Sequence, residues 1–194
     1  MAFNGVLRAR VEPGGTAIVF GAGPIGIGAF LGLQVVGVAA SDITVVEPSP
    51  TRRAAIERLG ATNTLDPDAA DVVGELLSWT HGRGADAVLE CSGAPSAFAV
   101  APVLAALGRR VVVVAIFEEP VPFNPGVLLR GAEIVGSLGY APGVFGRVID
   151  AMATGAYPTD GWVDHIALDD LVEDGLEALR AGRRMKVLVD LPDT

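Results

Sequence analysis

Three glycines near the N-terminus have the residue type and spacing of a phosphate-binding turn. Gly21, Gly23 and Gly26 follow the pattern G-x-G-x-x-G, directly after the β-branched and aromatic run of residues 16–20. The order strand, glycine turn, helix places the N–H groups of a helix N-terminus where they can bind a dinucleotide pyrophosphate. In that arrangement Gly21 makes the sharp turn, Gly23 lets the backbone approach the phosphates, and Gly26 lets the helix pack on its strand.

An acidic residue lies at the expected distance after this turn. Glu47 ends a predicted strand over residues 43–47, about 20 residues after Gly26, where a dinucleotide fold places the carboxylate that binds the adenosine ribose. A carboxylate there disfavours the extra 2′-phosphate of NADP. Arg52 and Arg53 follow closely and would favour that phosphate, unless they form a solvated first turn of the next helix. The glycines and the acid together predict a dinucleotide site, with NAD favoured over NADP.

The apolar stretch over residues 16–40 has a second interpretation, a membrane-spanning helix. It carries no charged residue and exceeds the roughly 20 residues that a bilayer span requires. Its glycines and Pro24 would interrupt such a span, and its opening is strand-like. Acidic Glu12 and Asp42 lie beside it where a span would have a basic flank. We therefore expect no membrane association.

Composition narrows the classes of protein further. A chain of 194 residues is long enough for one domain with a full core. The net charge of −9 argues against binding to a nucleic-acid backbone, which requires a basic surface. The single cysteine, Cys91, excludes an intrachain disulfide and a cysteine-rich zinc site. No basic segment followed by an apolar core opens the sequence, so we expect a cytoplasmic location.

Strand-like and helix-like segments alternate along most of the chain, and this alternation predicts an α/β fold with a doubly wound parallel sheet. The predicted strands cover residues 16–20, 43–47, 63–65, 85–90, 111–114, 133–137 and 185–191. The predicted helices cover residues 2–11, 25–38, 50–59, 66–79, 95–107, 143–153 and 169–181, the last with Asp169 as its N-cap. Residues 155–168 are predicted to be irregular.

Small and polar residues follow the fourth predicted strand. Cys91, Ser92 and Gly93 lie at its carboxyl end, the edge at which parallel sheets bind their ligands. These residues are therefore candidate cofactor contacts. For Cys91 we favour a small buried apolar side chain over a catalytic thiol. His81 lies in a glycine-containing loop and is expected to be exposed.

Six segments of the chain resemble the medium-chain, zinc-containing alcohol dehydrogenases, most of all the butanediol, sorbitol and threonine dehydrogenase branch. In order they are VFGAGPIG, VVEPSPTRRAAIERLGA, GRGADAVLECSGAP, RRVVVVAIFEEPVPFNP, EIVGSLGY and LEALRAGRRMKVLVDL. The resemblance spans nearly the whole chain. It implies a Rossmann fold and an enzyme that transfers hydride between a secondary alcohol or polyol and NAD. It also implies a homodimer or tetramer formed through the sixth predicted strand.

The resemblance assigns cofactor contacts residue by residue. The matching positions are Gly21, Ala22, Gly23, Pro24, Ile25, Gly26, Glu47, Arg52, Cys91, Ser92, Gly93, Ala115, Ile116, Ser137 and Lys186. In the family the first six form the pyrophosphate turn, and the next two lie at the adenosine ribose. Lys186 matches a basic position near the phosphates, and the others line the path of the adenine and nicotinamide. Ala115 departs from the family, which commonly has glycine there.

The resemblance also implies a second domain that has no counterpart in this chain. In the family a front domain of similar size holds the catalytic zinc and the proton-relay residues. His81 and His165 fall in segments that the family does not use for zinc. We therefore expect zinc only in the full-length enzyme, no catalytic or metal-binding residue here, and no activity from this chain alone.

The domain organisation expected from the resemblance has three parts. Residues 1–15 would be the end of an interdomain linker helix, 16–140 the NAD-binding domain, and 141–194 a tail that returns to the absent domain. One alternative is a stand-alone NAD-binding or regulatory module without catalysis. A further alternative is an S-adenosylmethionine methyltransferase. It is weaker because that class usually has an acidic residue at the end of the first strand, where this chain has Phe20.

Overall fold

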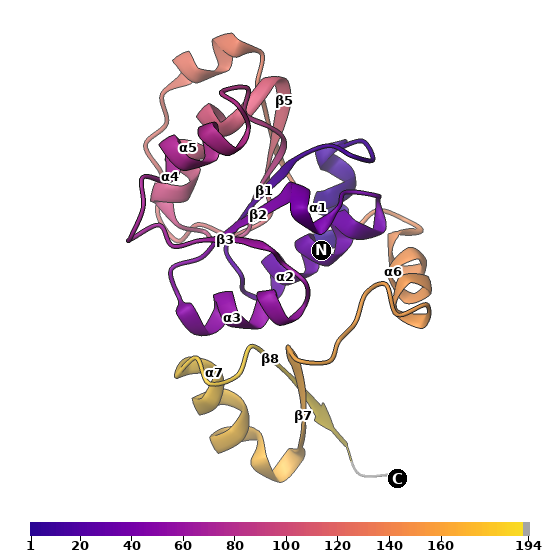
Figure 1. Ribbon diagram of the computed structural model, residues 1–194. Helices are drawn as coiled ribbons and strands as arrows, with labels where there is room; N and C mark the ends of the chain where they lie inside the picture. Colours follow the sequence, from indigo (N-terminus) through magenta and orange to yellow (C-terminus); the bar gives the residue numbers. More distant parts are fainter. Residues whose placement is uncertain (192–194) are drawn as a thin grey trace. The chain divides into compact units, whose positions relative to one another are not determined.

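The computed structural model describes residues 1–191 and divides the chain into two units, a larger one over Met1–Tyr157 and a smaller one that begins at Pro158. Figure 1 shows both units. The helices and strands of the larger unit are α1 (Ala2–Ala9), β1 (Ala17–Phe20), α2 (Pro24–Val35), β2 (Ile43–Val46), α3 (Pro50–Arg58), β3 (Asn63–Leu65), α4 (Val72–Trp79), β4 (Ala85–Glu90), α5 (Pro95–Leu104), β5 (Ala105–Val113), β6 (Glu133–Gly136) and α6 (Val144–Ala153), with 3-10 segments at Ala40–Asp42 and Pro125–Arg130.

The larger unit is built on a six-stranded parallel sheet. Its strand order is β3-β2-β1-β4-β5-β6, so the chain starts in the middle, runs to one edge, and then crosses over to the other. This order confirms the predicted doubly wound sheet. Phe20 at the end of β1 pairs with Val46 of β2 on one side and with Glu90 of β4 on the other. The carboxyl ends of these three strands therefore lie level with one another.

Helices cover both faces of this sheet. Figure 1 shows α1 and α2 on one side of the strands and α4 and α5 on the other. The four residues of β1 are all buried because the strand is central and covered on both faces. Ile18 and Phe20 belong to the core under α4 and α5, together with Leu76, Ala101 and Leu104.

Helix α1 and the residue that ends the larger unit both pack on α2. Phe3 and Val6 of α1 are buried, and a Cβ added at Gly32 of α2 would lie 2.9 Å from the Phe3 ring. The Tyr157 hydroxyl donates a hydrogen bond of 2.9 Å to the Gly28 carbonyl in the middle of α2. Burial raises the pKa of Tyr157 to about 12. The glycines of α2 thus serve close packing as well as the turn.

The predicted boundary between the fifth helix and the fifth strand was wrong. Helix α5 ends at Leu104, three residues earlier than predicted, and β5 begins at Ala105 instead of Val111. Ala105 pairs with Ala85, and the Leu104 carbonyl lies 2.7 Å from where a Cβ of Gly84 would be. Strand pairing and close backbone packing thus decide a boundary that the apolar sequence leaves open.

The predicted start of the helix after β3 was also wrong. Helix α4 begins at Val72, with Asp71 as N-cap, and the Asp71 side chain accepts a hydrogen bond of 3.1 Å from the Gly74 N–H. The Asp66 side chain instead accepts the N–H of Asp68 at 3.0 Å. An Asp–Pro–Asp sequence suits a helix start and a turn equally, and here it forms the turn.

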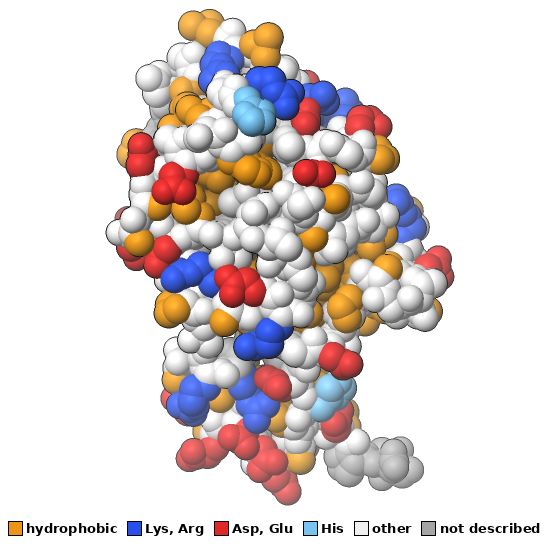
Figure 2. Space-filling view, viewed as in Figure 1, with side chains coloured by type: hydrophobic (Ala, Val, Ile, Leu, Met, Phe, Trp, Pro, Cys, Tyr) orange, Lys and Arg blue, Asp and Glu red, His pale blue; other side chains and the backbone are white. Residues whose placement is uncertain are grey.

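The smaller unit contains a strand that the sequence did not predict. Residues 163–167 were expected to be irregular, but they form β7 (Val163–Ala167), which pairs in parallel with β8 (Lys186–Asp190). Between the two strands the chain forms one helical segment, with 3-10 residues Leu168–Asp170, a π-helix over Leu171–Glu177, and α7 (Ala178–Arg180). Asp169 lies within the 3-10 turn, so its predicted role as N-cap was wrong. Figure 2 shows acidic side chains gathered at one end of this unit.

The apolar stretch after β1 forms a short helix in place of a membrane span. Helix α2 has 12 residues. Within residues 1–191, no helix is both long enough and apolar enough to cross a bilayer.

Candidate functional site

The glycine turn joins β1 to α2. A side chain would have a different steric consequence at each of its three glycines. Gly21 has a φ of +93°, which side chains rarely adopt, and a Cβ there would lie 3.1 Å from the Ser92 Cα. A Cβ at Gly26 would collide with the Gly21 carbonyl. At Gly23 the φ is −74°, and a Cβ would meet nothing within 4 Å. The fold itself therefore requires Gly21 and Gly26, whereas Gly23 leaves space beside a cavity.

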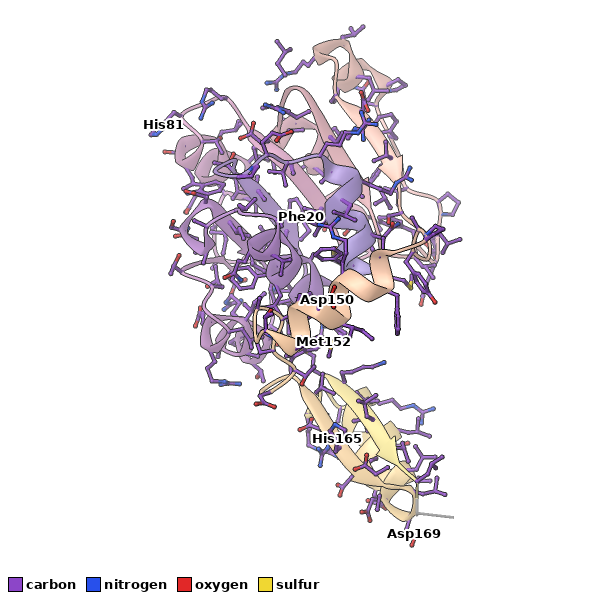
Figure 3. All side chains as sticks on the ribbon, turned by 90° about the vertical axis from the view of Figure 1, so that its right-hand side faces the viewer. Phe20, His81, Asp150, Met152, His165 and Asp169 are labelled. Atoms are coloured by element: carbon purple, nitrogen blue, oxygen red, sulfur yellow. The ribbon has the colours of Figure 1, made fainter. Side chains whose placement is uncertain are left out.

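That cavity has a volume of about 560 Å³ and lies at the carboxyl ends of β1, β2 and β4. Phe20, which is labelled in Figure 3, ends β1 and lines this cavity. Its lining residues are Phe20, Gly21, Gly23, Val46, Glu47, Pro48, Arg52, Pro67, Asp68, Val72, Cys91, Ser92, Ala94, Ser96, Ala97 and Val100. Helix α2 begins at this cavity with Gly23 as N-cap and Pro24 in its first turn. The first N–H groups of a helix have no acceptor within the helix, so this end favours an anion.

Glu47 connects the end of β2 to the glycine turn. Its carboxylate is buried and accepts the Ala22 N–H at 2.7 Å and the Ser49 N–H at 2.9 Å, one on each oxygen. Each carboxylate oxygen has a second lone pair available for a further donor. Glu47 can thus hold the turn and still accept hydroxyl groups from a ligand in the cavity.

The two adjacent arginines have different environments. Arg53 donates to the Glu47 and Pro48 carbonyls, both at 2.7 Å, and pairs with Asp66 at 2.9 Å. Arg52 lines the cavity, and its side chain forms no ion pair within residues 1–191. Of these two arginines, Arg52 is therefore the one whose guanidinium is available to a ligand.

The residues after β4 form a tight turn over a buried carboxylate. Glu90 accepts hydrogen bonds from the N–H groups of Ser92 and Gly93 and from the Ser92 hydroxyl. Burial raises the pKa of Glu90, and the bonds from Ser92 and Gly93 lower it in part. Burial first, and the nearby Glu90 charge second, raise the pKa of the Cys91 thiol. Both effects disfavour the thiolate of Cys91, whose side chain is half-buried and lines the cavity, so the sequence expectation of a fully buried side chain was only partly right.

The structure gathers some of the predicted site residues around the cavity and leaves others out. Gly21, Gly23, Glu47, Arg52, Cys91 and Ser92 line it. Ser92, Gly93 and Ile116 border a second hollow of about 400 Å³. Ala22, Pro24, Ile25, Gly26 and Ala115 line neither of the two.

Two further predicted residues lie in other surroundings. Ser137 follows β6, is buried, and accepts the Asn4 side-chain amide at 2.9 Å. Lys186 belongs to β8 of the smaller unit. For both, the proposed contact with a cofactor stays a prediction.

Several residues that line the cavity were not predicted from the sequence. Pro48 follows β2, Pro67 and Asp68 follow β3, and Ser96 and Ala97 lie in the first turn of α5. The rule that ligands meet the carboxyl ends of parallel strands would have found those after β2 and β3. The residues of α5 reach the cavity only because the helix packs back over β4.

The residues that the structure describes do not fit a zinc ion. Within residues 1–191, no three His, Cys, Asp or Glu side chains come together in a way that would hold a metal. Figure 3 shows His81 at the periphery of the larger unit, away from Phe20. His165 lies in the smaller unit and pairs with Asp190 at 2.9 Å. No catalytic step through zinc is therefore assigned to these residues.

The strand order, the glycine turn at the start of α2 and the acid after β2 define a Rossmann-type cofactor-binding domain. A match to the zinc-binding dehydrogenase family covers residues 24–154, and this chain belongs to that family.

Relatives and solved structures agree with this assignment. The (R,R)-butanediol dehydrogenase of Bacillus subtilis is 34% identical over 193 residues, which are 97% of this chain and 54% of the relative. The crystal structure of 2R,3R-butanediol dehydrogenase from Bacillus subtilis matches with a TM-score of 0.90 and 32% identity, over 99% of this chain and 55% of that one. A putative zinc-binding dehydrogenase from Sinorhizobium meliloti 1021, bound to NADP, matches with a TM-score of 0.84 and 30% identity, over 97% of this chain and 56% of that one. This chain thus spans about half the length of the proteins that it matches.

Proposed function

We propose that this chain is the NAD-binding half of a zinc-dependent dehydrogenase, which in full length transfers hydride between a secondary alcohol or polyol and NAD. The observation that carries the proposal is the space at Gly23. A Cβ there would meet no protein atom within 4 Å, while the residue lines the cavity at the start of α2. The fold does not use that space, and the helix N-terminus beside it has the N–H groups that bind a pyrophosphate.

In this proposal each group around the cavity has a separate task. The N–H groups at the start of α2 bind the pyrophosphate, and Glu47 accepts the hydroxyl groups of the adenosine ribose. Arg52 also lines the cavity and adds a positive charge for the phosphates. Apolar residues such as Val72 and Val100 exclude water from the base. NAD, when bound, supplies the acceptor for the hydride.

The site favours NAD over NADP. The Glu47 carboxylate repels a 2′-phosphate, and Arg53 cannot compensate because the Glu47 and Pro48 carbonyls and Asp66 already bind its guanidinium. Calorimetric titration of the 194-residue chain with each dinucleotide tests this, and we expect the smaller dissociation constant for NAD. Equal or tighter binding of NADP would mean that Arg52 outweighs Glu47. Failure to bind either dinucleotide would refute the proposed function.

We also propose that two copies associate through β6, in a homodimer or within a tetramer. β6 is the last strand in the sheet order, and Leu129 and Leu138, which flank it in sequence, are 92% and 86% exposed. An apolar sheet edge favours pairing with another strand. Light scattering should give two or four times the monomer mass at micromolar concentration, and Leu138→Arg should lower that mass. A wild-type chain that stays monomeric under these conditions would contradict the proposal.

A further inference from the structure

One carboxylate beside the cavity belongs to none of the tasks described above. Glu90 is fully buried at the end of β4 and does not line the cavity. Its Oε1 accepts the Ser92 N–H at 2.9 Å, the Gly93 N–H at 3.0 Å and the Ser92 hydroxyl, and its Oε2 accepts the Gly93 N–H at 3.2 Å. All of these donors come from a single turn, which we call the Ser92–Gly93 turn.

The Ser92–Gly93 turn lies between two segments that are far apart in sequence. On one side Ser92 is so close to Gly21 that a Cβ there would lie 3.1 Å from the Ser92 Cα. On the other side a Cβ at Gly93 would lie 2.8 Å from the Ile116 carbonyl oxygen. Ser92 lines both the main cavity and the second hollow. The turn thus forms the wall between these spaces, and a shift of the turn would change both.

The main chain of Glu90 fixes the neighbouring strand end as well. Its carbonyl oxygen accepts the Val114 N–H at 2.9 Å and the Ala115 N–H at 3.2 Å. The next residue, Cys91, donates its N–H to the Phe20 carbonyl at 3.0 Å. Pairing with β1 and β5 therefore fixes the main chain of Glu90. The Glu90 carboxylate in turn fixes the Ser92–Gly93 turn through its hydrogen bonds.

Burial of a carboxylate without a cation has a free-energy cost that packing alone does not explain. Within residues 1–191, no Lys, Arg or His forms an ion pair with Glu90. An apolar side chain of similar size would fill the same space without that cost. What the carboxylate adds is a set of acceptors that matches the donors of one turn.

We propose that Glu90 is a positioning residue for dinucleotide binding, an inference that rests on the proposed function. It holds the Ser92–Gly93 turn against the glycine turn. It thereby fixes the position of this part of the cavity wall and the space that remains for the ligand. Glu90 touches no ligand itself and acts through Ser92.

Substitutions at the two ends of β4 test this proposal. Glu90→Leu removes all the acceptors, and Glu90→Gln keeps one oxygen that can still accept an N–H. The matched control is Asp86→Asn at the other end of the same strand, where Asp86 accepts the Thr16 N–H and hydroxyl and pairs with Arg109. We expect NAD affinity to fall about tenfold in Glu90→Leu, by less in Glu90→Gln, and not at all in Asp86→Asn, even where the control loses thermal stability.

Amide hydrogen exchange of the wild-type chain gives a second test that needs no variant to fold. The N–H groups of Ser92 and Gly93 should exchange as slowly as those of β4, because the Glu90 carboxylate binds them. Exchange at the rate of exposed loops would overturn the proposal. Unchanged NAD affinity in folded Glu90→Leu would do the same. Absence of dinucleotide binding in the wild type would instead refute the proposed function, while the exchange rates would still show whether Glu90 holds the turn.

Discussion

The substitution Gly23→Val tests whether the space beside Gly23 is needed for ligand binding and not for folding. In the structure a Cβ at Gly23 meets nothing within 4 Å, and its φ of −74° and ψ of −175° suit a branched residue. The loss of glycine from an N-cap position costs about 1 kcal/mol of stability. We therefore expect a folded variant with a slightly lower melting temperature.

Binding should suffer much more than folding. The added branched side chain enters the cavity at the start of α2 and displaces the pyrophosphate from the N–H groups there. A lost hydrogen bond to a charged group is worth about 1.5 to 3 kcal/mol, which corresponds to a decrease in affinity of about 10- to 150-fold. Steric overlap adds to that loss, so calorimetric titration should detect no binding of NAD.

The matched control is Gly146→Val in α6. A Cβ at Gly146 also meets nothing within 4 Å, and this glycine is exposed and not among the residues that line the cavity. NAD affinity should stay at the wild-type value in this variant. A folded Gly23→Val chain that binds NAD like the wild type would place the phosphate site elsewhere.

Four further predictions concern stability, thiol chemistry and activity. Arg53→Ala should lower the free energy of unfolding by about 1 to 3 kcal/mol, because the Arg53 side chain binds two carbonyls and a carboxylate, whereas Arg52→Ala should leave it nearly unchanged in urea unfolding. Because burial raises the pKa of Glu90, the folded chain binds more protons than the unfolded chain between pH 4.5 and that raised pKa. Relative to Glu90→Gln, the wild type should therefore gain stability as pH falls through the raised pKa toward 4.5, and a pH-independent difference would contradict this. Cys91 should stay unreactive toward a chromogenic disulfide at neutral pH until the chain is denatured, because burial raises its thiol pKa. The purified 194-residue chain should contain no stoichiometric zinc and form no NADH from butane-2,3-diol, sorbitol or threonine, and turnover together with bound zinc would show that a catalytic site was missed.

The sequence by itself determined the parts of the protein that depend on local spacing. Gly21, Gly23 and Gly26 required a turn between a strand and a helix, because their spacing has a steric meaning within one short segment. Glu47 could be placed because the length of one helix and one strand fixes its distance from the glycines. The alternation of strands and helices determined the parallel sheet, because each crossover between parallel strands needs a covering helix.

Element boundaries and short pairings depended on contacts between distant residues. Residues 163–167 were predicted to be irregular. They form a strand because they pair with β8, which lies more than 20 positions later in the chain. The start of β5 at Ala105 follows from its pairing with Ala85 and the close approach of Gly84. No local pattern in the sequence contains that information.

Only the tertiary structure decided which charged groups near the site are available. Arg52 and Arg53 are adjacent and identical in type, yet packing gives Arg53 three partners and leaves Arg52 at the cavity. From the sequence, Glu90 is predicted only as the end of a strand. Its hydrogen bonds to the Ser92–Gly93 turn form only when that turn folds back over the carboxylate. The physical reason is the same in both cases. Hydrogen-bond partners are set by side-chain direction and burial, which depend on elements that lie far apart in the chain.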